Sequence, residues 1–154
     1  MNTIIEKVIF LQKVELFSDV PTEQLSHLAA VANRISIEKD KYLFRESDPA
    51  NNLYLIISGR IHVLRDDALL RQLGPYDEIG LLGFFDNAPR AADALTTENT
   101  ELLKINKVDF FDLLEDRVHL SHGILQYFVK QIRQLLEAID TKNLQSYIEE
   151  KNNQ

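Results

Sequence analysis

The sequence contains no cysteine among its 154 residues. Without cysteine the chain has no thiol nucleophile, no disulfide and no thiolate ligand for a metal ion. This absence fits a protein of a reducing compartment, where disulfides are rare. We therefore expect a cytoplasmic protein.

Long apolar runs are also missing, since no stretch approaches the ~18–20 residues that a membrane-spanning helix needs. The N-terminal segment is apolar enough to resemble a signal sequence. Charged and polar residues nevertheless interrupt it, namely Glu6, Lys7, Gln12, Lys13 and Glu15. A signal sequence would not tolerate them in its apolar region. We expect an amphipathic helix here and no membrane insertion.

Positive charge is scarce: 17 Lys and Arg residues face 24 Asp and Glu residues, for a net charge of −7. The basic residues are scattered along the chain, whereas contacts to nucleic-acid phosphates need them concentrated. The sequence therefore predicts no direct binding to nucleic acid.

The hydrophobic pattern divides a single expected domain, residues 1–154, into three parts. Residues 1–33 show helical spacing, and the predicted buried positions of a second helix are Leu25, Leu28, Ala29 and Ala32. Residues 34–106 contain short runs of strand-forming residues bounded by turn-prone residues. These runs are residues 42–46, 53–58, 60–65, 68–73, 91–97 and 101–105. They predict an antiparallel β-roll of the jelly-roll (double-stranded β-helix) type, so the fold class is mainly β with flanking helices.

Residues 107–150 are predicted to be helical again, first over 107–114 and then over a long Pro-free stretch from about residue 118. Within it Leu125, Phe128, Ile132, Leu135 and Ile139 recur at alternating steps of three and four. This spacing is typical of a coiled-coil seam, which predicts a homodimer through this long helix. Packing of the same residues on the chain's own roll is the alternative.

Residues 74–92 interrupt the strands and contain two glycines, Gly80 and Gly83, followed by Arg90. We expect a short helical turn here, whose free N–H groups and glycine backbone can approach an anion. A guanidinium grips a phosphate through two parallel hydrogen bonds. The alternative is an ordinary surface arginine beside ordinary turns.

Three stretches of the sequence together resemble the cyclic-nucleotide-binding domains of catabolite activator proteins and kinase A regulatory subunits. They are Gly74-Pro75-x-Asp77-x-x-Gly80, Pro89-Arg90-Ala91-Ala92, and the strands over residues 44–48 and 53–61. The resemblance covers roughly residues 15–130. It implies that residues 74–92 form a phosphate-binding cassette and that the bound ligand is a cyclic nucleotide.

Carried onto this sequence, the resemblance implies a set of ligand-binding residues. They are Gly80, Leu81, Leu82, Gly83, Arg90, Ala91 and Ala92. Arg90 would hold the phosphate, and Gly80, Leu82 and Gly83 would offer backbone contacts. Alanine at position 91, where members that favour cyclic GMP often carry a hydroxyl, favours cyclic AMP.

The sequence departs from the family pattern at two positions. Leu81 stands where the family usually has a glutamate that holds the ribose 2′-hydroxyl, and Ser47 stands where it usually has a turn glycine. The loss at Leu81 costs on the order of 1–3 kcal/mol of binding. It leaves open a degenerate domain that serves as a dimerisation or interaction scaffold, or a domain for another phosphate-bearing anion.

Nothing in the sequence indicates catalysis, a cofactor or a metal site. No nucleophile-elbow pattern is present, and His119 and His122 lack a third ligand. The chain also lacks the helix-turn-helix that transcription factors of the family carry, so we expect output through a separate effector protein or domain.

Overall fold

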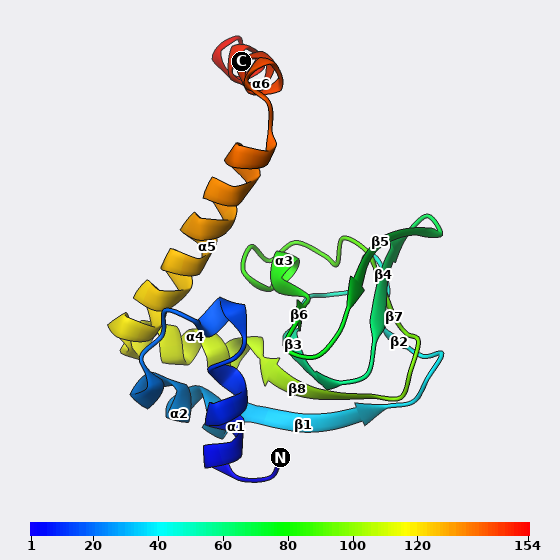
Figure 1. The fold of residues 1–154 in the computed structure, drawn as a ribbon, viewed down its shortest axis with the longest axis vertical. Helices are drawn as coiled ribbons and strands as arrows, with labels where there is room; N and C mark the ends of the chain where they lie inside the picture. The colour runs from blue at the N-terminus through cyan, green and yellow to red at the C-terminus, as the bar shows by residue number, and fades with distance from the viewer.

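A computed structural model describes residues 1–154 as two four-stranded antiparallel sheets flanked by helices (Figure 1). The helices are α1 (Ile4–Leu11), the 3-10 turn η1 (Glu15–Phe17), α2 (Thr22–Val31), α3 (Leu81–Phe84), α4 (Lys107–Asp116), α5 (Val118–Ala138) and α6 (Thr141–Asn152). The strands are β1 (Ala32–Ile37), β2 (Tyr42–Phe44), β3 (Asn52–Ser58), β4 (Ile61–Arg65), β5 (Ala68–Leu73), β6 (Glu78–Ile79), β7 (Asp93–Thr96) and β8 (Thr100–Asn106). The predicted β-roll with N-terminal helices, a short internal helix and C-terminal helices is confirmed.

The two sheets face each other, with strand orders β1-β8-β3-β6 and β2-β7-β4-β5. Successive side chains of a strand point to opposite faces, and β3 uses both. Tyr54 and Ile56 pack inside the roll, whereas Leu53 and Leu55 pack in the larger cluster that the helices share. The first sheet is therefore buried on both sides.

The helices cover the outer face of this first sheet. The predicted residues Leu25, Leu28 and Ala29 of α2 are buried there, as is Ala32 at the start of β1. They belong to a cluster of 19 buried residues that joins the N-terminal helices, α4, the first part of α5 and the sheet. This packing fixes the base of α5 beside the roll.

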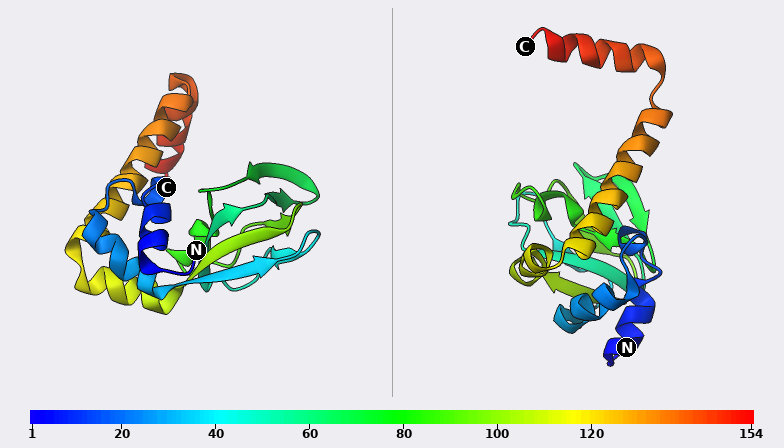
Figure 2. Two further views of the ribbon diagram at one scale, coloured as in Figure 1. Left: turned by 60° about the horizontal axis from the view of Figure 1, so that its bottom comes forward. Right: turned by 90° about the vertical axis from the view of Figure 1, so that its left-hand side faces the viewer.

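The long C-terminal stretch forms two helices where the sequence predicted a single long one. Asp140 ends the first by capping the second, because its side chain accepts a hydrogen bond from the backbone N–H of Asn143 at 3.0 Å. Aspartate is a strong helix N-cap. The sequence prediction looked for a helix end at proline or glycine and therefore missed this break. α5 rises away from the body and α6 turns sharply at its end (Figure 2). None of the helices combines the length and the hydrophobicity needed to cross a membrane.

Candidate functional site

The cassette, residues 74–92, depends on two glycines in backbone conformations that other residues rarely adopt. Gly80 has φ +89° and precedes α3, and Gly83 has φ +82° within it. A Cβ on Gly80 would collide with the Arg90 guanidinium, and one on Gly83 with the Ala88 carbonyl oxygen. Both glycines are therefore required by close approach as well as by φ.

Arg90 turns its side chain inward and is only 4% exposed. Its Nη1 donates to the Gly80 carbonyl oxygen at 2.7 Å, and its Nη2 donates to the Asn52 carbonyl oxygen at 2.5 Å. The guanidinium carbon lies 4.2 Å from the centre of the Phe44 ring, in the position of a cation–π contact. Arg90 is thus a buried cation inside the roll and is not a surface arginine.

No carboxylate neutralises this cation, since Arg90 belongs to none of the five ion pairs of the molecule. Asp48 acts on Arg90 electrostatically without forming an ion pair with it. The two acidic residues before Gly80 are engaged elsewhere. Asp77 accepts from the Gly74 N–H at 2.9 Å, and Glu78 accepts from the Tyr127 hydroxyl at 3.3 Å. The Nε of Arg90 is buried without a hydrogen-bond partner. A guanidinium has five N–H donors, so several here are unused and suited to an anion.

Burial also affects the acidity of the groups inside the roll. It lowers the pKa of the Arg90 guanidinium, while Tyr54 and Asp48 act in the opposite direction. Burial likewise raises the pKa of the Tyr54 hydroxyl, which the nearby Arg90 partly offsets. Desolvation is therefore the dominant influence on the pKa values of Arg90 and Tyr54, and an anion beside Arg90 would favour its charged form.

The main chain of Arg90 is held by a turn from far earlier in the sequence. The Ser47 N–H donates to the Arg90 carbonyl at 2.9 Å, and the Arg90 N–H donates to the Asp48 carbonyl at 2.8 Å. Ser47 has φ 73°, the left-handed conformation in which a serine is strained by about 1 kcal/mol. The turn thus fixes where the Arg90 side chain starts.

The other predicted residues differ in how far they are exposed to solvent. Leu81 is half-buried and packs against the apolar cluster shared with the helices, whereas Leu82 is 71% exposed. Ala92 is buried and Ala91 is exposed. Within the predicted set, Gly80 and Arg90 are joined by a hydrogen bond.

Sequence reasoning missed three contributors to the site. Asn52 contributes a main-chain carbonyl, which any residue type could supply, so no pattern signals it. Phe44 contributes its ring. Lys107, at the start of α4, donates to Asn87 at 2.9 Å and to the Gly83 carbonyl at 3.3 Å, and so ties the end of the cassette to the helices. A lysine directly after the last strand carries no local signal for this contact.

An aromatic cluster joins the cassette to the C-terminal helices. Phe84 and Phe85 of the cassette contact Phe110 and Phe111 of α4, and Phe85 also contacts Phe128 of α5. The ring centroids of these pairs lie 5.1–5.7 Å apart, mostly edge to face. Because a packed core does not deform continuously, one of these rings can move only if its neighbours move too.

Both the sequence and the fold resemble those of known proteins. The sequence pattern of the cyclic nucleotide-binding domain matches residues 34–117. An uncharacterized NTE family protein of Mycobacterium tuberculosis is 28% identical over 125 residues, which cover 80% of this chain and 21% of that protein. A CRP-like cAMP-activated global transcriptional regulator of the same organism is 25% identical over 128 residues, which cover 80% of this chain and 57% of that protein. The chain therefore spans well under two thirds of either relative.

Among solved structures, the N-terminal domain of a transcriptional regulator from Streptomyces coelicolor superposes with a TM-score of 0.75. Its sequence is 26% identical, and the superposition covers 86% of this chain and 95% of that one. The sequence match, covering more than half of the residues, and the shared β-roll lead to one conclusion: the chain belongs to the cyclic nucleotide-binding domain family.

Proposed function

We propose that this domain is a non-catalytic regulatory module that binds a cyclic nucleotide in the cassette, with cyclic AMP preferred over cyclic GMP. The observation that carries the proposal is Arg90, a buried guanidinium with unused donors and no carboxylate partner. The cyclic phosphate would accept from Arg90 in a charge-assisted pair. The glycine backbone at Gly80 and Gly83 would allow the ligand to approach closely.

Similarity to the Mycobacterium tuberculosis regulator supports the choice of ligand, since that protein is described as cAMP-activated. The preference for cyclic AMP rests on Ala91, which has no hydroxyl to offer to a guanine. In this proposal the ligand displaces the cassette and thereby shifts the populations of two arrangements of α5.

The output would pass through α5, which carries a stripe of exposed apolar residues. These are Leu125, Val129, Ile132, Leu135, Leu136 and Ile139. A second copy presenting the same stripe would cover it, because a two-fold axis places the same surface patch of both copies face to face. We therefore propose a homodimer through α5, with a separate effector protein or domain reading its state.

A second candidate function is favoured by Leu81. This residue packs against apolar neighbours, so it offers no acceptor to a ribose hydroxyl. A domain with this feature would serve as an interaction scaffold, or would bind a phosphate-bearing anion that lacks that hydroxyl. The buried, unneutralised Arg90 favours ligand binding over a pure scaffold.

Isothermal titration calorimetry with cyclic AMP and cyclic GMP tests the proposal on three proteins. The wild type should bind cyclic AMP more tightly. Arg90→Lys should lose about ten- to a hundredfold in affinity, since it keeps the charge but not the paired donors. Arg34→Lys, on the exposed face of β1, should bind like the wild type. Absence of binding to folded wild type at millimolar nucleotide would overturn cyclic nucleotides as the ligand.

A further inference from the structure

The cassette touches α5 near both ends of its short helix, through two neighbouring residues of α5. Before α3, the Glu78 carboxylate accepts from the Tyr127 hydroxyl at 3.3 Å. After α3, the Phe85 ring packs edge-on against Phe128, with centroids 5.1 Å apart and planes 79° apart. One short segment of α5 therefore contacts the cassette on both sides of α3, once through a polar pair and once through an aromatic pair.

The Glu78 side chain faces α5 and not the inside of the roll. Its neighbour Ile79 packs inside the roll, so strand alternation turns Glu78 to the opposite face. In the ladder Glu78 is paired with Leu55, which is buried in the cluster shared with the helices. The carboxylate is thus unavailable to a ligand beside Arg90, and its hydroxyl partner comes from α5.

The other polar contacts of α5 do not reach the cassette. Lys130 pairs with Asp19 and Gln131 contacts Glu15, both on the N-terminal segment. Ser121 donates to the Leu114 carbonyl of α4. Beyond Gln131 every side chain of α5 is exposed. The Tyr127–Glu78 pair is therefore the polar contact between α5 and the cassette.

We propose that the Tyr127–Glu78 contact is a latch that holds α5 against the roll and transmits cassette displacement to it. Tyr127 is only 6% exposed and Glu78 is half-buried. Loss of the hydroxyl would leave the half-buried carboxylate without its donor from α5, which is unfavourable until α5 moves and water enters. Arg71 and Asp77 on the roll, with Glu15 near Tyr127, are the other charged groups that act on this pair. The ligand-driven step rests on the proposed function, whereas the latch is a property of the chain itself.

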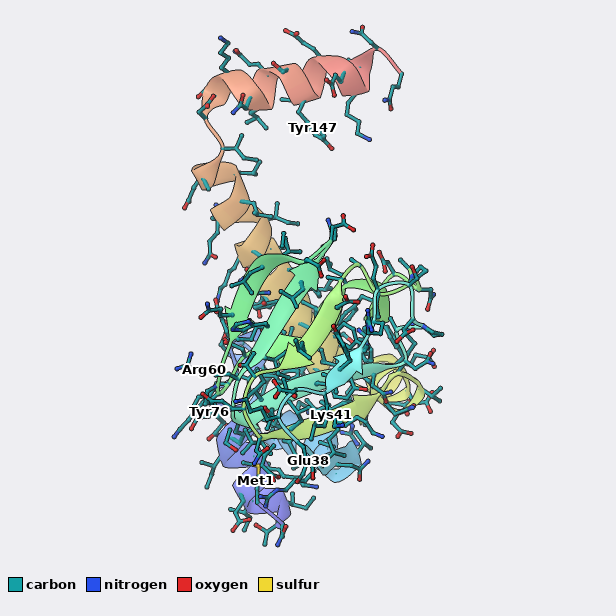
Figure 3. The ribbon with its side chains drawn as sticks, turned by 90° about the vertical axis from the view of Figure 1, so that its right-hand side faces the viewer. Met1, Glu38, Lys41, Arg60, Tyr76 and Tyr147 are labelled. Atoms are coloured by element: carbon teal, nitrogen blue, oxygen red, sulfur yellow. The ribbon has the colours of Figure 1, made fainter.

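Spin-label distance measurements test the latch, because a chain without cysteine accepts two labels at introduced cysteines without background. Suitable exposed positions are Lys41 on the far side of the roll (Figure 3) and Gln134 on α5. Tyr127→Phe should broaden the roll-to-α5 distance distribution or shift it to longer distances. Tyr147→Phe makes the same chemical change on α6, well separated from the roll (Figure 3), and should leave the distribution unchanged.

A distribution for Tyr127→Phe that matches the wild type would overturn the latch. If Tyr127→Phe does not fold, Glu78→Ala should release α5 and Glu78→Gln, which keeps an acceptor, should retain it. Adding cyclic AMP to the labelled wild type separates this proposal from the proposed function. If cyclic AMP leaves the distance distribution of the wild type unchanged while Tyr127→Phe alters it, cyclic AMP is rejected as the ligand and the latch is supported.

Discussion

At the scale of single residues, Arg90 shows how a buried cation is accommodated without an acid. Two main-chain carbonyls and the face of Phe44 surround the guanidinium. Carbonyl dipoles and an aromatic ring stabilise the positive charge less than a carboxylate would, and they do not neutralise it. Such a positive charge can still attract an anion, whereas a salt bridge within the chain would have neutralised it.

Gly80→Ala is expected to damage the site specifically. The new Cβ would meet the Arg90 guanidinium in a backbone with φ +89°. We expect a loss of roughly 1–2 kcal/mol or more in the free energy of unfolding, together with loss of ligand binding. Urea denaturation measures the first and calorimetry the second. Gly74→Ala is the control, because nothing lies within 4 Å of its Cβ position. Equal stability of the two variants would contradict the structure.

Leu81→Glu tests whether the residue at position 81 lies beside the ribose 2′-hydroxyl of a bound nucleotide. If the ligand is a cyclic nucleotide, a carboxylate here should raise the affinity for cyclic AMP by about ten- to a hundredfold. The affinity for 2′-deoxy cyclic AMP should stay the same, since it has no hydroxyl to donate. Calorimetry on both nucleotides decides the matter. An equal gain for both would mean that position 81 does not contact the ribose.

Sequence patterns single out residues of the candidate site whose side-chain identity matters, namely Gly80, Gly83 and Arg90. Glycine tolerates the positive φ at positions 80 and 83, and arginine offers paired N–H donors. The carbonyl of Asn52 and the packing of Leu81 depend on how distant strands meet. No local pattern encodes either.

At the scale of elements, strand and helix periodicity predicted most of the fold. It missed a very short strand and a helix break that depends on one capping residue. β6 has only two residues, Glu78 and Ile79, which is too few for an alternating pattern. The break at Asp140 depends on a single capping side chain. Of the five predicted seam residues, Leu125, Ile132, Leu135 and Ile139 are exposed, as a dimer seam would be in a single chain. Phe128 instead packs on Phe85 of the chain's own roll, as in the alternative.

Ile132→Asp is expected to separate the proposed dimer. The side chain is 57% exposed in one chain, so the charge should alter the monomer's stability little while preventing burial of the stripe. Size-exclusion chromatography with light scattering should show a dimer for wild type and a monomer for the variant. Gln134→Asp, off the stripe on the same helix, should remain a dimer. A monomeric wild type at high concentration would contradict the dimer.

At the scale of the whole molecule, the docking of α5 is linked to pH through Glu78. Burial raises the pKa of this carboxyl above its usual value of 4.5, with smaller opposing effects from its own backbone N–H, Arg71 and Tyr127. The folded state therefore holds the proton more tightly than the unfolded chain. This contribution to stability is full below the unfolded pKa of 4.5 and is lost as pH rises through the raised folded pKa.

Comparison of wild type with Glu78→Gln isolates this linkage. The glutamine keeps the shape and an acceptor but does not titrate. As pH rises from about 4 to about 7, the free energy of unfolding of wild type should fall relative to that of Glu78→Gln. Urea denaturation at several pH values measures the difference. No difference across this pH range would place Glu78 in a solvated environment, and a difference of opposite sign would mean that its ionised form is stabilised in the fold; either result would contradict the structure.

The carbonyls that hold Arg90 have one further consequence, for how strongly any ligand can bind. Two of the five guanidinium donors are already taken by the carbonyls of Gly80 and Asn52, so an anion in the proposed site would use the remaining ones. It would gain less free energy than from a guanidinium whose donors are all free. In the proposed function, this partial occupation favours moderate affinity and ready release. It suits a device that follows a changing ligand concentration better than one that retains its ligand permanently.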